Sequence, residues 1–196
     1  AGGAPGGGGA SAGGGASGAA GAGGSSATCP GSAGPAMVQV GSFCIDSTEV
    51  AQADYAAFLV AKGADTSGQP QAECSWNTSY EPASYTVGTP EATATGCYGT
   101  PYDPSTKPSH PVSCIDWCDA RAYCEWAGKR LCGALGSGGT VVGDPAEPQT
   151  SEWVNACSNG GADVYPYGVV QTGTECASGS VATQPVKSYP DCHGHP

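Results

Sequence analysis

Cysteine is the residue type that offers the most chemistry in this sequence. The chain has 196 residues and 11 cysteines. Such a density is typical of secreted domains held by disulfides, whereas zinc sites usually need closely spaced Cys pairs, and no Cys-x-x-Cys occurs here. Because the total is odd, one thiol is expected to be free, to pair between chains or to lack its partner. The candidate disulfide cysteines are Cys44, Cys74, Cys97, Cys114, Cys118, Cys124, Cys132, Cys157, Cys176 and Cys192.

Three further features could carry chemistry, and each has a structural interpretation that we favour. Cys118 falls in the first turn of a predicted helix, where a redox thiol would be activated, but a disulfide is the preferred prediction. Lys129 and Arg130 could clamp an anion, yet cations are also favoured where a helix ends and acids lie nearby. Residues 192–195 (Cys-His-Gly-His) could bind a metal, but a solvated turn is the simpler interpretation. We therefore assign no catalytic, cofactor-binding or metal-binding residue.

Carboxylates and indoles give two more predictions. Asp116 and Asp119 lie one helical turn apart, and we interpret Asp116 as a helix cap and Asp119 as an exposed residue. Trp117, Trp126 and Trp153 could stack on sugar rings, but tryptophans at helical positions more often belong to the core. We therefore expect these three indoles to be buried.

The charge balance excludes several classes of function. The net charge is −11, with only six Lys and Arg residues, so the chain lacks the basic surface that nucleic acids or anionic membranes require. No apolar run approaches the roughly 20 residues that span a bilayer. Asn77-Thr-Ser79 matches the N-glycosylation pattern, which matters only in a eukaryotic secretory pathway.

Hydrophobic periodicity predicts an α+β, loop-rich domain. Alternating residues predict a strand over 37–45, and a helix over 50–62 carries Tyr55, Phe58 and Leu59 on one face. A second amphipathic helix, with Ala120, Tyr123, Cys124 and Ala127 on its apolar face, begins at Asp116 and ends before Gly128. The other predicted elements are a disulfide-tied loop over 64–109, a strand over 111–115, a loop over 133–150, a helix over 151–157 and a strand over 186–189.

Residues 1–34 contain only Gly, Ala, Ser, Pro and Thr apart from Cys29. Such a segment buries too little apolar surface to offset its chain entropy, so it predicts a disordered tether. The folded unit is expected over 35–196. A removed secretory or lipoprotein signal upstream, with a possible lipid anchor, would explain a tether that holds a domain away from a surface.

Several sequence pieces, in order, resemble the formylglycine-generating enzyme (sulfatase-modifying factor) family. The most specific run is His110-Pro-Val112, followed by Asp116-Trp117 and Ala122-Tyr-Cys-Glu-Trp-Ala-Gly-Lys-Arg-Leu131. The other pieces are Gly34–Val50, Ser151-Glu-Trp153, Gly160-Gly161 and Tyr165-Pro-Tyr-Gly168.

This resemblance implies a C-type-lectin-like fold and oxidation of a sulfatase cysteine to formylglycine, with copper and calcium. In the family, the catalytic cysteines and much of the substrate groove follow the segment matched here, so the fold is expected to be incomplete at the C-terminus. Cys124 and Cys157 align with cysteines whose family partners lie in that later part. Ala177 aligns with a calcium-binding Asn and offers no side-chain oxygen.

The resulting expectation is a secreted, periplasmic or cell-surface domain that is not catalytic by itself. Its expected ligand is an unknown peptide or glycan, and copper and calcium are expected only with the later half. Two alternatives remain: a fragment of an active formylglycine-generating oxidase, and a lectin-like binding or structural surface module.

Overall fold

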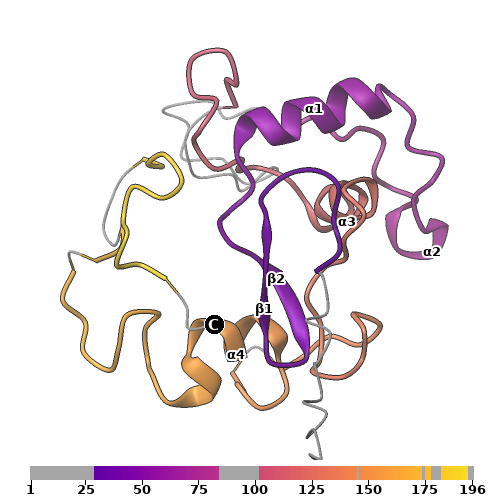
Figure 1. The fold of residues 1–196 in the computed structure, drawn as a ribbon. Helices are drawn as coiled ribbons and strands as arrows, with labels where there is room; N and C mark the ends of the chain where they lie inside the picture. Colours follow the sequence, from indigo (N-terminus) through magenta and orange to yellow (C-terminus); the bar gives the residue numbers. More distant parts are fainter. Residues whose placement is uncertain (1–28, 84–101, 145, 174, 178–181, 194–196) are drawn as a thin grey trace, which may run out of the picture.

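The computed structural model describes residues 29–83, 102–144, 146–173, 175–177 and 182–193. Figure 1 shows the helices α1, α2 and α3 gathered on one side of a central hairpin, with α4 on the other side. The elements are β1 (Met37–Val40), β2 (Phe43–Asp46), α1 (Gln52–Lys62), α2 (Gln71–Cys74), α3 (Trp117–Trp126), α4 (Glu152–Cys157) and the 3-10 turn η1 (Asn159–Gly161). The mixed helix and strand content agrees with the predicted α+β class. No helix in the described ranges is long and apolar enough to cross a membrane.

The predicted strand over 37–45 is a hairpin instead. β1 and β2 pair antiparallel, with Met37 opposite Asp46 and Val40 opposite Phe43. The two residues between the strands begin with Gly41, whose φ of 54° suits glycine in a tight hairpin turn. A turn this short leaves the apolar alternation almost unbroken, so the pattern alone looks like one strand.

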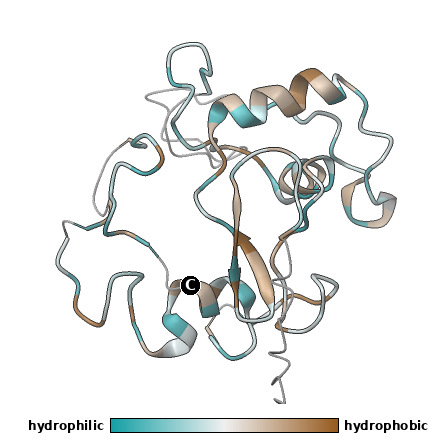
Figure 2. Ribbon diagram, viewed as in Figure 1, coloured by the Kyte–Doolittle hydropathy of each residue, from teal (hydrophilic) through white to brown (hydrophobic). Residues whose placement is uncertain are grey.

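Aromatic side chains form the larger of two cores, between α1 and α3. Tyr55 and Phe58 of α1 are fully buried against Tyr123 of α3, with ring centroids 5.7 Å from Tyr123 in both cases. We call this cluster the aromatic core; its buried members are Tyr55, Phe58, Tyr80, Ala122, Tyr123 and Ala127. In Figure 2, one part of α1 and the hairpin carry hydrophobic colours, while most connecting loops have pale or hydrophilic colours.

The ends of both long helices follow the predicted signals. Asp116 caps α3 by accepting from the backbone N–H groups of Cys118 and Asp119, at 2.7 and 3.0 Å. α1 ends at Gly63, whose φ is 58°. The buried face of α3 is rotated from the prediction, because it includes Cys118, Asp119 and Ala122.

The second core is small and joins the hairpin to α4. We call it the hairpin core; its buried members are Val40, Phe43 and Ala156, with Ile45 and Leu135 packed against them. α4 begins at Ser151, whose hydroxyl accepts from Val154 N at 3.4 Å. The predicted helix over 151–157 is therefore confirmed.

Residues 29–36 lie against the end of α3, although most of them fall in the predicted tether. Cys29 forms a disulfide with Cys44, and Ser32 N donates to Ala127 O at 2.8 Å. A Cβ added at Gly34 would lie 2.1 Å from the Tyr123 hydroxyl oxygen, so only glycine fits there. The ordered part of the chain thus includes residues that composition alone places in a tether, and residues 1–28 lie outside the described ranges.

Two predicted strands are not strands. Around 111–115 the structure has only an isolated bridge between Ala51 and Pro111 and a hydrogen bond from Val112 N to Val50 O. Cys114 then has a φ of 68°, which breaks any extended run. Residues 186–189 form a turn in which Ser188 N donates to Pro185 O at 3.1 Å.

Candidate functional site

Six of the described cysteines form three disulfides with one another, and Cys114 is disulfide-bonded as well. The pairs are Cys29–Cys44, Cys74–Cys118 and Cys176–Cys192. The structural interpretation of Cys118 is therefore confirmed. Cys29, which the sequence placed in a tether, is the partner of Cys44, and Cys97 lies outside the described residues.

Cys124, Cys132 and Cys157 are free thiols in the structure, although all three were disulfide candidates. Cys132 is exposed, and the other two are half-buried. Loss of water around the sulfur is the main reason why the pKa of each thiol is raised, even for Cys132, whose residue as a whole is exposed; for Cys124 the nearby Asp46 carboxylate helps to raise the pKa to about 11. Protonated thiols are weak nucleophiles and weak metal ligands.

Within the described ranges, no group of three or more His, Cys, Asp or Glu side chains could hold a metal ion. Cys192 is joined to Cys176, so its sulfur is not available as a thiolate in the Cys-His-Gly-His segment. Residues 194–196 of that segment lie outside the described ranges.

Lys129 and Arg130 have the structural roles that we favoured. Lys129 Nζ lies 2.6 Å from Asp46 Oδ1 and donates to Pro35 O at 2.6 Å, which ties the N-terminal segment to the hairpin. Arg130 donates from Nη1 and Nη2 to both oxygens of Glu152, at 2.6 and 2.7 Å. Glu152 also accepts from Gly133 N at 2.9 Å, so a buried carboxylate organises this loop.

Burial raises the pKa of Glu152, but the hydrogen bonds from Arg130 and Gly133 lower it by more. The net result is a pKa below the ordinary value. The carboxylate therefore stays ionised at neutral pH beside a half-exposed guanidinium, an arrangement that stabilises the loop.

The Cys74–Cys118 disulfide joins α2 to the first turn of α3, and each of its cysteines has an exposed tryptophan within two residues in the sequence. Trp76 is 61% exposed and Trp117 is 50% exposed. Trp76 Nε1 donates to Glu73 O at 2.8 Å, and the Arg121 guanidinium lies 5.5 Å from the centroid of the Trp117 ring. Both side chains therefore have a partner on this chain despite their exposure.

Of the three helical tryptophans predicted to be buried, only Trp126 packs against the core, and it is partly buried. Trp126 packs against Phe58 and Tyr123 in the aromatic core, with centroids 5.7 Å away in both cases. Trp117 and Trp153 are exposed, so the prediction is wrong for both. The buried residues of α3 are Cys118, Asp119, Ala122 and Tyr123, and those of α4 are Glu152 and Ala156, so neither Trp117 nor Trp153 lies on a buried face.

A buried polar network lies behind the disulfide. Asn77 Nδ2 donates to Asp119 Oδ1 at 2.8 Å and to Gln69 Oε1 at 3.1 Å. Asp119 Oδ2 accepts from Asp116 N at 3.2 Å, which completes the α3 capping box. Asp119 is only 3% exposed, so its predicted exposure is wrong, and burial raises the pKa of its carboxyl.

The same network removes Asn77 from consideration as a glycosylation site. Its side chain is buried and its amide already donates to two partners. A glycan on this nitrogen would require the network to open, so the sequence pattern at 77–79 is coincidental in the folded protein.

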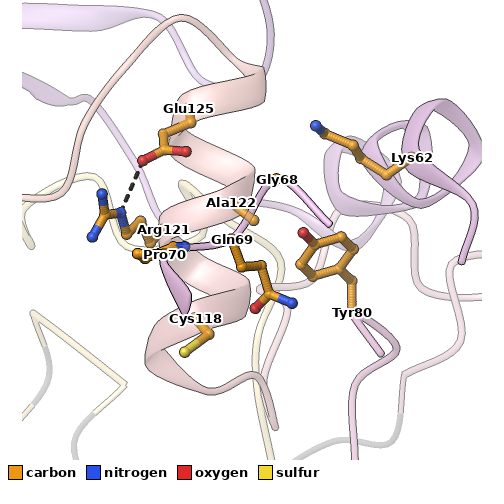
Figure 3. Close-up of a pocket in the computed structure, with 9 residues that line it drawn as sticks. All are labelled: Lys62, Gly68, Gln69, Pro70, Tyr80, Cys118, Arg121, Ala122 and Glu125. Carbon is orange, nitrogen blue, oxygen red and sulfur yellow. Dashed lines mark hydrogen bonds and ion pairs between the residues drawn. The ribbon is translucent and has the colours of Figure 1, made fainter. Parts of the chain in front are cut away.

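A small pocket lies beside this network, between the end of α1 and the outer face of α3 (Figure 3). Arg121 Nε and Glu125 Oε1 form an ion pair at 2.8 Å along one wall. Lys62 lies across the pocket on α1, as Figure 3 shows. The lining residues are Lys62, Gly68, Gln69, Pro70, Tyr80, Cys118, Arg121, Ala122 and Glu125.

Comparison with known proteins identifies the family. The model for the sulfatase-modifying factor enzyme 1-like domain matches residues 8–193, so the chain belongs to that family. The match begins inside the glycine-rich segment that composition predicts to be a tether.

Three curated relatives are formylglycine-generating enzymes. The enzyme of Streptomyces coelicolor is 28% identical over 193 residues, covering 80% of this chain and 54% of the relative. That of Thermomonospora curvata is 31% identical over 149 residues, covering 67% and 42%. A bovine enzyme is 36% identical over 63 residues, which cover 32% of this chain and 13% of the bovine enzyme. The chain thus spans about half the length of the Streptomyces coelicolor enzyme and less than half of the other two relatives. No solved structure matches the chain.

Proposed function

We propose that this protein is an extracytoplasmic member of the formylglycine-generating class and that the described residues are its scaffold rather than its oxidising centre. The family match and the names of the relatives support the class. In this proposal the scaffold is C-type-lectin-like, and the copper- and calcium-dependent steps belong to residues beyond the segment matched here.

The state of the three free thiols is the observation that carries the scaffold assignment. Oxidation of a substrate cysteine at a copper centre needs protein thiolates as soft ligands. Here burial raises the pKa of Cys124, Cys132 and Cys157, and no described cation lowers any of them below its ordinary value. Lys129 acts against the rise at Cys124 but does not overcome it.

An aldehyde assay tests this proposal. The 196-residue protein is incubated in air with copper and a sulfatase-type cysteine peptide, and the aldehyde is captured with a hydrazide and measured by mass spectrometry. We expect no aldehyde above the level without protein. The enzyme from Streptomyces coelicolor is the positive control, and turnover by the 196-residue protein would contradict the scaffold assignment.

Thiol kinetics provide an independent check on the same observation. With a colorimetric disulfide reagent in excess, we expect exposed Cys132 to react first, and Cys124 and Cys157 to react more slowly in the native protein. The Cys132→Ser variant should lose the fast phase. A fast phase that survives this substitution, or that reaches its full rate below neutral pH, would show an activated thiol elsewhere.

The extracytoplasmic location rests on the disulfides, which persist in oxidising compartments. The pairs Cys29–Cys44 and Cys74–Cys118 each join separate elements of the fold, so reduction would loosen the structure. Differential alkylation in the producing cell is the test. Disulfides found reduced in the cell would contradict this location.

A non-enzymatic binding module is the second candidate. It is favoured by one observation, the pair of exposed indoles beside the Cys74–Cys118 disulfide. The two candidates are compatible, because a scaffold can carry a binding surface apart from an oxidising centre.

A further inference from the structure

The three free thiols lie close to one another, although they come from different parts of the fold. The charge of the Cys157 thiolate is among the causes that raise the pKa of Cys132, so these two sulfurs are near enough to interact electrostatically. Cys124 interacts with Cys132 in the same way. Cys132 is therefore the thiol that the other two share as a neighbour, and it is also the exposed one.

The backbone next to Cys132 is hydrogen-bonded to the start of α4. Gly133 N donates to Glu152 Oε2 at 2.9 Å, and Glu152 N donates to Gly133 O at 3.0 Å. One residue further along, Ala134 and Ser151 form an antiparallel bridge. These contacts hold the loop that carries Cys132 against the helix that carries Cys157.

The position of Cys157 on α4 brings its side chain toward this loop. Cys157 is the last residue of the helix and follows Glu152 by about 7.5 Å along the helix axis. Side chains in a helix lean toward its N-terminus, which is the end that Gly133 contacts. Because Cys132 is exposed, a shift of Cys132 toward Cys157 removes little packing.

We propose that Cys132 is a modification site for small-molecule disulfides such as oxidised glutathione, and that Cys157 resolves the adduct into a Cys132–Cys157 disulfide. The Cys132 thiolate attacks one sulfur of the small disulfide, whose S–S bond breaks and releases one small thiol. The Cys157 thiolate then attacks Cys132 Sγ and releases the other small thiol. The two protein thiols lose two electrons and two protons, which the two released thiols carry away. This reaction does not depend on the proposed function.

Cys157 is a better resolving thiol than Cys124. Cys124 packs against the aromatic core, and loss of water, with help from the Asp46 carboxylate, raises its pKa to about 11. Only loss of water raises the pKa of Cys157. A thiolate therefore forms more readily at Cys157. This pairing differs from the one that the family resemblance implies for Cys157, whose family partner follows the segment matched here.

The new disulfide would strengthen the region that has the smaller core. The hairpin core has three buried members, and the loop carrying Cys132 is joined to α4 by hydrogen bonds and by the Arg130–Glu152 ion pair. A covalent link between this loop and the end of α4 restricts the unfolded chain. The oxidised protein should therefore unfold at a temperature about 5 °C higher than the protein with free thiols.

The reaction is tested with the 196-residue protein and oxidised glutathione, in the absence of reductant. Samples are blocked with iodoacetamide over time, digested without reduction and mapped by mass spectrometry. We expect the Cys132–Cys157 cross-linked peptide to accumulate while Cys124 remains open to alkylation. Because the pKa of Cys132 is raised, little thiolate is present at neutral pH, so the reaction is expected to take hours.

Three serine variants separate the roles of the thiols. Cys157→Ser should stop at a glutathione adduct on Cys132, without the shift in unfolding temperature. Cys132→Ser should form neither the adduct nor the cross-link. Cys124→Ser is the matched control and should form the Cys132–Cys157 cross-link as the wild-type protein does.

Several results would overturn the proposal. They are no reaction at Cys132 after a day, a glutathione adduct that persists on the wild-type protein, and a Cys124–Cys132 cross-link in place of the expected one. A Cys132–Cys157 cross-link that forms only in urea would also overturn it, because the pairing would then belong to the unfolded chain.

Discussion

The aromatic core and the hairpin core stabilise their surroundings by different means. Around α1 and α3, four buried aromatic rings and two alanines pack together, with ring centroids about 5 to 6 Å apart. Around the hairpin and α4, the buried apolar cluster has three members, Val40, Phe43 and Ala156, and the ion pairs of Lys129 and Arg130 join the loops. The first region depends mainly on apolar packing, and the second also depends on buried charged groups that are paired.

The largest expected difference between the two regions comes from the same substitution in each core. Phe58→Ala should cost about 4 kcal/mol of unfolding free energy, because Phe58 contacts Tyr55, Tyr80, Tyr123 and Trp126. Phe43→Ala should cost less, about 2 to 3 kcal/mol, since fewer buried neighbours line its cavity. Urea unfolding measures both, and equal costs would remove the distinction between the cores.

Removal of one charge should affect the hairpin region more than a similar removal on the surface of α3. Arg130→Gln leaves Glu152 buried with a weaker partner and should cost about 2 kcal/mol. Arg121→Gln removes a solvent-exposed i,i+4 pair and should cost less than about 0.5 kcal/mol. If both substitutions cost the same, the charge network of the hairpin region contributes no more than a surface pair.

The pH dependence of stability should depend on Glu152. Because its pKa is lower in the folded protein than in the unfolded chain, its contribution is complete above the unfolded value, ordinarily near 4.5 for Glu. The contribution is lost as pH falls through the folded pKa. The difference in unfolding free energy between the wild-type protein and Glu152→Gln should therefore be largest at neutral pH and shrink in acid. A difference that is constant from pH 7 to pH 3 would contradict this role.

The smallest expected differences in stability come from removing the hydroxyl groups of two tyrosines in the aromatic core. The Tyr55 hydroxyl donates to Tyr80 O at 2.8 Å, so Tyr55→Phe should cost about 1 kcal/mol. The buried Tyr123 hydroxyl has no hydrogen-bond partner among the described residues, so Tyr123→Phe should be neutral within about 0.5 kcal/mol. Thermal unfolding distinguishes the two, and a larger loss at Tyr123 would reveal a partner for its hydroxyl.

The sequence predicted the features that depend on local spacing. Helices over 52–62 and 117–126, the Asp116 cap and the burial of Tyr55 and Phe58 follow from residues within two turns of one another. The structural role of Cys118 also followed, from the cysteine density of the chain. Its partner Cys74 did not, because pairing depends on a fold that sequence spacing does not show.

Features that depend on distant partners could not be predicted. Asp119 is buried because Asn77, 42 residues earlier, satisfies its carboxylate. Trp117 is exposed because the tertiary position of α1 and α3 selects a face of α3 centred on Ala122 and Tyr123.

The close approach of Gly34 to Tyr123 has a practical consequence for anyone who shortens this protein. A version that begins at residue 35 would lack Cys29 and leave Cys44 as a new thiol in an oxidising solution. It would also expose the Tyr123 ring edge and the stem of Lys129, which Gly34 and Gly31 now cover. A soluble, monodisperse sample is therefore expected from versions that retain residues 29–34, and dimers linked through Cys44 from those that do not.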